Sequence, residues 1–157
     1  MATPPTSNLQ RDGVWGGEGT ACGRVRQIDY FHLVTRGWSG GIGYHFLIGH
    51  EGSIYQGRPL DWGGAHAGVP APNRNHSHIG IALLGSYSSH CRFYNSEQSI
   101  PTQAQFDSMW LLIDALINDM PTIQSIESHE PGDPGPWFYD YFESGTINTY
   151  RDGSRNN

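Results

Sequence analysis

Two residues near the end of the chain, His129 and Asp133, have side chains of the kinds that ligate metal ions. They flank the short stretch Glu130-Pro131-Gly132, and Pro134 follows directly. Proline and glycine constrain such a loop, which could therefore hold both side chains pointing the same way. The spacing alone favours a plainer interpretation, in which His129 is exposed and Asp133 caps a turn.

A third chemical group, the phenol of Tyr44, lies in the alternating segment 43–48. Alternation is typical of a strand, and residues 53–57 read as the returning strand of a hairpin. The alternation of residues 43–48 places Tyr44 on the same face as Phe46 and Ile48. From these residues alone, Tyr44 is equally well explained as a core tyrosine whose hydroxyl is bonded at the rim.

Two segments have the period of an amphipathic helix. Residues 25–36 carry apolar side chains and His32 at helical spacing, and a glycine follows as a stop signal. Residues 103–119 carry a clear apolar stripe. Thr102 and Gln105 form a capping-box pattern at the start of this second helix.

The remaining apolar segments, 78–84 and 122–128, read as strands, and the second would deliver His129 at its end. Strands interleaved with two helices predict an α/β domain with a single mixed β-sheet flanked by helices. Residues 1–23 are glycine-rich and lack a period, so we expect an irregular N-terminal arm before a domain over 24–157.

The charge and hydropathy of this 157-residue chain limit the classes of partner that it is expected to bind. Its formal net charge is −6 and its pI is near 5.6, which argues against nucleic acid, because phosphate binding needs clustered Lys and Arg. No apolar run is long enough to span a membrane. The N-terminal residues lack the basic-then-apolar pattern of a signal peptide, and we expect a monomer.

The ordered motifs together resemble the zinc amidases that cleave the amide between N-acetylmuramic acid and L-alanine in peptidoglycan. The motifs are the hairpin with Tyr44, the stretch Gly64-Ala65-His66-Ala67-Gly68, the run from His78 to Gly85, and His129 with Asp133-Pro134-Gly135. This family includes phage endolysins, bacterial muropeptide amidases and animal peptidoglycan-recognition proteins. The resemblance covers roughly Val25 to Phe142 and implies an amidase or peptidoglycan-recognition-like fold.

The resemblance also implies roles for individual residues. Tyr44 matches the family's active-site tyrosine, and His129 and Asp133 match the second and third zinc ligands. His66 and Asn75 match the loop that lines the substrate groove. The implied cofactor is therefore zinc, and the implied partner is peptidoglycan or a muropeptide.

The family's first zinc ligand, which lies on an early strand, has no clear counterpart. In one reading residues 25–36 are the family's first helix and His32 faces the core. In the other, His32 lies on a strand and is the missing metal ligand. We favour the helix, because Gly37-Trp38 then keeps its family distance from Tyr44. The zinc site would then lack a ligand, and zinc binding and catalysis should be impaired.

A second departure is the short loop between His129 and Asp133, which lacks the lysine that many relatives carry there. Two functions remain. One is a peptidoglycan hydrolase acting in endolysin-type lysis of the cell wall. The other is a catalytically impaired relative that binds peptidoglycan fragments or a protein partner. We expect a cytoplasmic or phage-associated protein that acts on the cell wall after release.

Overall fold

A computed structural model describes residues 20–67, 74–85, 87 and 100–129 of the chain. Its elements are α2 (Ala21–Tyr30), the π-helix η1 (Phe31–Thr35), β1 (Phe46–Ile48), β2 (Ile54–Gln56), α3 (Arg74–Ser77), β3 (Ile81–Leu83) and α4 (Gln103–Asp119). The three strands form one mixed sheet in the order β2-β1-β3. This architecture confirms the predicted fold class. None of the helices in the described ranges is long and apolar enough to cross a membrane.

The central strand β1 pairs with a neighbour on each side. It runs antiparallel to β2, with Leu47 opposite Tyr55, and parallel to β3, with Leu47 opposite Ala82. The antiparallel pair is the predicted hairpin. All three strands are shorter than the sequence pattern suggests, and the residues that precede β1 and β3 lead into the candidate site.

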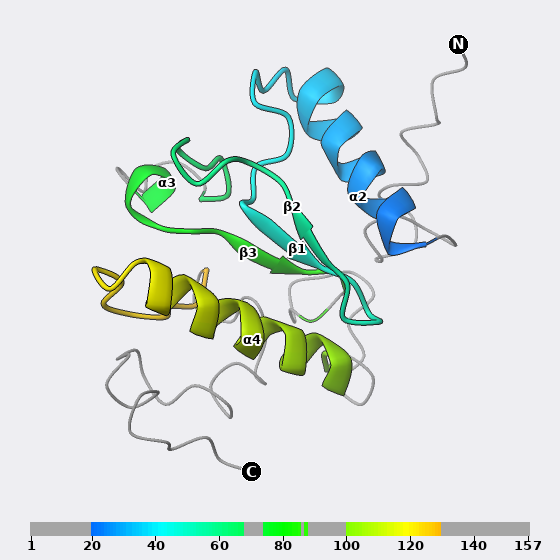
Figure 1. The fold of residues 1–157 in the computed structure, drawn as a ribbon. Coiled ribbons are helices and arrows are strands. Elements are labelled where there is room, and N and C mark those ends of the chain that lie inside the picture. The colour runs from blue at the N-terminus through cyan, green and yellow to red at the C-terminus, as the bar shows by residue number, and fades with distance from the viewer. Residues whose placement is uncertain (1–19, 68–73, 86, 88–99, 130–157) are drawn as a thin grey trace.

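Helices cover both faces of the sheet (Figure 1). Leu47 and Ile48 are fully buried, and because neighbouring residues of a strand point to opposite faces they enter different clusters. Ile48 packs with the apolar stripe of α4, whereas Leu47 packs with Ile28 of α2. The sheet is therefore the middle of three layers, which holds the ends of β1 and β3 in fixed positions.

The first helix begins earlier than predicted. Thr20 caps α2 by accepting a hydrogen bond from the amide of Gly23 at 3.2 Å, so the helix starts at Ala21 rather than Val25. The predicted irregular arm over 1–23 therefore overlaps with helix at its last residues, and residues 1–19 lie outside the described ranges. The pattern failed here because the capping threonine lies in a glycine-rich stretch.

The predictions for α4 and for the segment that follows it have different outcomes. The helix α4 has the predicted bounds, and both halves of the Thr102–Gln105 capping box are formed. Residues 122–128, in contrast, are not a strand, and this prediction is wrong. Ile123 and Ile126 of this segment pack against the α4 cluster. Apolar residues flanked by turn residues are compatible with an irregular segment packed on the core as well as with a strand.

The predicted face of Tyr44 is also wrong. Tyr44 packs on the cluster beneath α2, whereas Phe46 and Ile48 belong to the α4 side. The amides of His45 and Phe46 both donate to the carbonyl oxygen of Gly80, at 2.9 and 3.1 Å. Two consecutive residues opposite one acceptor resemble a β-bulge, which shifts the alternation by one residue. This irregularity points Tyr44 toward the candidate site.

Candidate functional site

The imidazole of His66 lies at the centre of a group of polar and aromatic side chains. A Cβ at Gly64 or Gly80 would collide with its ring, so these two glycines provide the space that the ring occupies. Tyr44 stacks on the ring with centroids 6.4 Å apart and an interplanar angle of 18°. The rings of His45 and His66 meet edge to face, with centroids 5.7 Å apart. Burial lowers the pKa of His66 to about 4, and the ring is therefore neutral at neutral pH.

Asn75 holds the loop that carries His66. Its Oδ1 accepts hydrogen bonds from the amides of His66 and Ala67, at 2.9 and 2.8 Å, and its Nδ2 donates to the carbonyl oxygen of Ala67 at 3.2 Å. The side-chain amide thus pairs with the backbone much as a neighbouring strand would. The sequence predicted that Asn75 binds substrate, and these bonds give it a structural role in the same loop.

His129 contacts the same loop from the other side. Its Nε2 lies 2.7 Å from the carbonyl oxygen of His66. A carbonyl only accepts hydrogen bonds, so Nε2 carries the hydrogen, and in the neutral ring Nδ1 carries the lone pair. Metal-bound histidines commonly donate their other nitrogen to a backbone carbonyl in this way. Tyr44 and His129 therefore approach His66 through its ring and its backbone, respectively.

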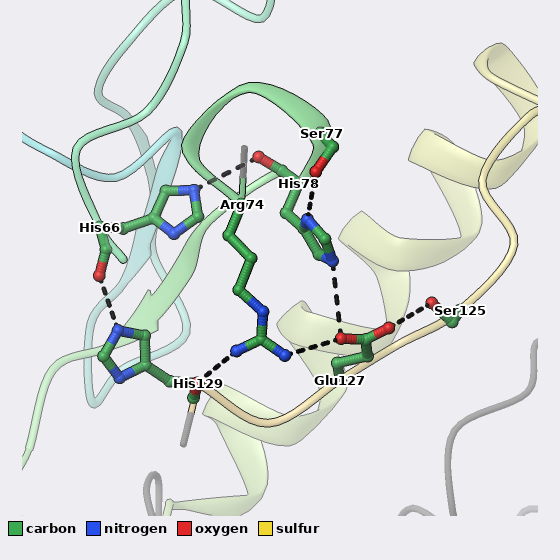
Figure 2. A network of polar contacts seen from close by, with 7 residues as sticks. All are labelled: His66, Arg74, Ser77, His78, Ser125, Glu127 and His129. Atoms are coloured by element: carbon green, nitrogen blue, oxygen red, sulfur yellow. Dashed lines mark hydrogen bonds and ion pairs between the residues drawn. The ribbon is translucent and has the colours of Figure 1, made fainter. Parts of the chain in front are cut away.

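A second set of contacts ties the segment before His129 to α3 (Figure 2). The Arg74 guanidinium donates to the carbonyl oxygen of His129 at 2.8 Å and to the Glu127 carboxylate at 3.0 Å. The carboxylate also accepts from the Ser125 hydroxyl at 2.9 Å and lies 3.5 Å from Nε2 of His78. The hydrogen bond from Ser125 and the nearby His78 and Arg74 lower the pKa of Glu127.

Three side chains fix the backbone just before Tyr44. Asp29 accepts from the amide of Ile42 at 3.0 Å, and Nδ1 of His32 accepts from the amide of Gly43 at 3.1 Å. Arg58 donates to the carbonyl oxygen of Ile42 at 2.8 Å. A second nitrogen of Arg58 donates to the carbonyl oxygen of Gly63, also at 2.8 Å, which joins this turn to the loop of His66.

His32 lies in the helical segment η1, as the favoured interpretation expected, and not on a strand. His32 is 6% exposed, and the centroid of its ring lies 4.4 Å from that of Trp38. Burial, and then the charge of Arg36, lower the pKa of His32. The only lone pair of the neutral ring is the one on Nδ1, which accepts from Gly43. Ligation of a metal by His32 would require that bond to break.

His45 is a site residue that the sequence did not single out. It is 2% exposed, and its Nδ1 accepts from the amide of Gly80 at 3.0 Å while Nε2 donates to the carbonyl oxygen of Trp62 at 3.0 Å. This one ring joins the starts of β1 and β3 to the loop before His66. Its position directly after Tyr44, at the start of an apolar strand, was the available signal, because a buried histidine needs partners for both nitrogens.

The zinc site implied by the resemblance includes His129 and Asp133. His129 has the hydrogen bond typical of a ligand, but Asp133 lies outside the described residues. Within the described ranges no three His, Cys, Asp or Glu residues form a group that could hold a metal ion. These residues therefore fit one ligand and do not by themselves form a zinc site.

Comparison with known proteins defines the class to which this fold and site belong. The profile of a family described as N-acetylmuramoyl-L-alanine amidase matches residues 14–136, which is most of the chain. The chain belongs to this family. The match extends from within the predicted N-terminal arm to just past Asp133.

Individual relatives agree with this assignment. A pig N-acetylmuramoyl-L-alanine amidase is 40% identical over 65 residues, which are 41% of this chain and 10% of the pig protein. The endolysin amidase LysCS from Clostridium intestinale is 34% identical with a TM-score of 0.56, covering 71% of this chain and 67% of LysCS. A variant of Drosophila PGRP-LB, solved with tracheal cytotoxin, is 31% identical with a TM-score of 0.50, covering 61% of this chain and 48% of its own. The chain thus spans only a small part of the pig protein and about half of PGRP-LB.

Proposed function

We propose that this chain is a peptidoglycan amidase, which binds a muropeptide and cleaves the amide between N-acetylmuramic acid and L-alanine. The observation that carries this proposal is the position of His129. Its ring is held by the carbonyl oxygen of His66, and the ring of His66 stacks on Tyr44. A tyrosine and an oriented histidine on either side of one loop are suited to amide hydrolysis.

In this proposal the site residues have different roles. The loop of His66, which Asn75 braces, contacts the muropeptide, and the hydroxyl of Tyr44 orients the scissile carbonyl. His129 and Asp133 would hold zinc, with the lone pair of His129 on Nδ1. Zinc, when bound, would supply a Lewis acid and an activated water. Within the described ranges no three His, Cys, Asp or Glu residues form a group that could hold zinc, so His129 and Asp133 are the two ligands proposed here.

A second candidate is a binding protein that recognises muropeptides without cleaving them. It is favoured by the use of the His32 lone pair within the core, where Nδ1 accepts from the amide of Gly43. The Drosophila relative in complex with tracheal cytotoxin supports recognition of a ligand by this fold. The same loop around His66 would then be the binding surface.

One experiment separates the two candidates. The full chain is purified without added metal, its zinc content is measured, and it is incubated with N-acetylmuramoyl tripeptide. An amidase should contain stoichiometric zinc and release the peptide, and a chelator should stop the release until zinc is restored. A binder should bind the muropeptide and leave it intact. Release that persists in excess chelator would exclude the zinc mechanism.

We further propose that the protein acts on the cell wall in the manner of an endolysin. The similarity to the Clostridium endolysin amidase supports this role. The formal charge of −6 does not favour attraction to anionic wall polymers, so wall binding would depend on specific contacts at the site. Lysis of purified walls by the added protein, lost in His129→Ala, would support it.

A further inference from the structure

The segment that delivers His129 is held by the side chain of Arg74 in α3. Residues 122–128 form no strand with the described sheet, so their register is not fixed by a ladder of backbone hydrogen bonds to β1, β2 or β3. Arg74, the first residue of α3, makes two contacts with this segment instead: one to the backbone of His129 and one to the side chain of Glu127 (Figure 2).

The geometry of the guanidinium suits this task. Its planar fork offers separate N–H groups in fixed directions, so one side chain can bind a carbonyl and a carboxylate two residues apart at the same time. A lysine carries the same charge without this fork. The side chains of Arg74 and Glu127 are each 40% exposed, and an ion pair this exposed adds little to stability. The contacts of Arg74 should therefore affect the position of residues 127–129 rather than the stability of the fold.

Glu127 is itself oriented. One carboxylate oxygen accepts from the hydroxyl of Ser125, and the other faces both Arg74 and His78. The carboxylate thus fixes the direction of the guanidinium, and the guanidinium fixes the carbonyl of His129. The ring of His129 then reaches the carbonyl oxygen of His66 from a defined backbone position.

We propose that Arg74 is the positioning residue of His129. It holds the backbone of residues 127–129 so that Nε2 of His129 donates to the carbonyl of His66, which sets the tautomer and direction of the ring. The importance of this position for binding and hydrolysis rests on the proposed function. The positioning itself can be measured in the metal-free protein.

The test is a long-range proton–nitrogen correlation spectrum of the full chain labelled at histidine. The chain has eight histidines, and the spectrum of His129→Gln identifies the signals of His129. In the wild type the hydrogen should be on Nε2. Arg74→Gln should give a mixture of both tautomers at His129, and Arg74→Lys should restore the wild-type pattern only in part. Arg26→Gln, which removes an exposed arginine of α2, should change nothing.

Two controls separate local positioning from general damage. His45 has both ring nitrogens bonded inside the fold, so its signals should stay at their wild-type positions in Arg74→Gln. Glu127→Gln keeps the acceptor oxygen and should disturb His129 less than Arg74→Gln does. An unchanged His129 pattern in Arg74→Gln would overturn the proposal, and so would equal shifts at His45 and His129.

Titration with zinc chloride adds a second readout. If the wild type binds zinc, Arg74→Gln should weaken the binding about tenfold or more, as loss of outer-shell partners commonly does. Equal zinc affinity of wild type and variant would contradict the proposal. A wild type with the expected His129 spectrum that binds neither zinc nor the muropeptide would refute the proposed function and leave the positioning role intact.

Discussion

Replacing Gln105 with alanine should remove roughly 3–5 kcal/mol from the free energy of unfolding. The side chain of Gln105 is fully buried on the first turn of α4. Its Nε2 donates to the carbonyl oxygens of Ile48 and Leu84, at 3.1 and 3.2 Å. Its Oε1 accepts from the amide of Thr102 at 3.1 Å and the hydroxyl of Tyr87 at 2.7 Å. One amide therefore joins the ends of β1 and β3 to the start of α4.

The expected loss of unfolding free energy follows from the groups that lose their partners in Gln105→Ala. Four hydrogen bonds are lost, and a typical buried one contributes about 1 kcal/mol net. Ile48 keeps a second partner, because its carbonyl oxygen also accepts from the amide of Leu84 at 2.8 Å. The amide of Thr102 loses its capping partner, and a cavity opens beside the core. The sum is a large part of the stability of a domain of this size.

Urea unfolding of the two alanine variants at positions 103 and 105 measures this effect. Gln103 lies on the same helix, and its single bond to Asp107, at 2.8 Å, is exposed. Gln103→Ala should therefore change the stability by about 0.5 kcal/mol or less. A Gln105→Ala variant within about 1 kcal/mol of the Gln103→Ala variant would refute the account of Gln105 as a buried clamp.

Three further predictions concern the site. His32→Ala should cost about 2–4 kcal/mol through the lost core ring while the zinc content stays as in the wild type; loss of zinc with full stability would contradict the core role. Gly80→Ala should push against the His66 ring and weaken muropeptide binding about tenfold or more, whereas Gly23→Ala, which meets only ordinary contacts, should bind normally in the same calorimetric titration. Because burial lowers the pKa of His66 from 6.5 to about 4, the unfolded chain takes up its proton first as the pH falls. Stability should therefore fall between pH 6.5 and 4, and His66→Gln should flatten that fall in pH-dependent thermal unfolding; an unchanged slope would refute this assignment.

The sequence predicted those parts of the fold that local pattern determines. The helix α4 has the predicted bounds, because its apolar stripe and its capping box indicate the same start. The central hairpin and the third strand were also predicted, since alternation and apolar runs depend on neighbouring residues. The helical position of His32 follows from the same kind of local spacing.

The errors concern features that only the tertiary structure determines. The face of Tyr44 depends on Gly80, whose carbonyl accepts from two consecutive amides, and no pattern near Tyr44 reveals this. Residues 122–128 have apolar residues suitable for a strand but pack without a described sheet partner. Arg74 and Glu127 are 53 residues apart, and no local pattern links two residues so distant in the sequence.

In the proposed site the muropeptide binds beside Tyr44 and next to His66 and His129, and the histidine spectrum of the labelled chain tests this binding most directly. N-acetylmuramoyl tripeptide is added to His-labelled protein in which Tyr44→Phe slows turnover. The signals of His66 and His129 should shift in a saturable manner. His50 follows the other end of β1, where its carbonyl bonds Thr102 of the α4 cap, and its signals should not move. Saturable shifts at His50 with unchanged signals at His66 and His129 would contradict this account of the site.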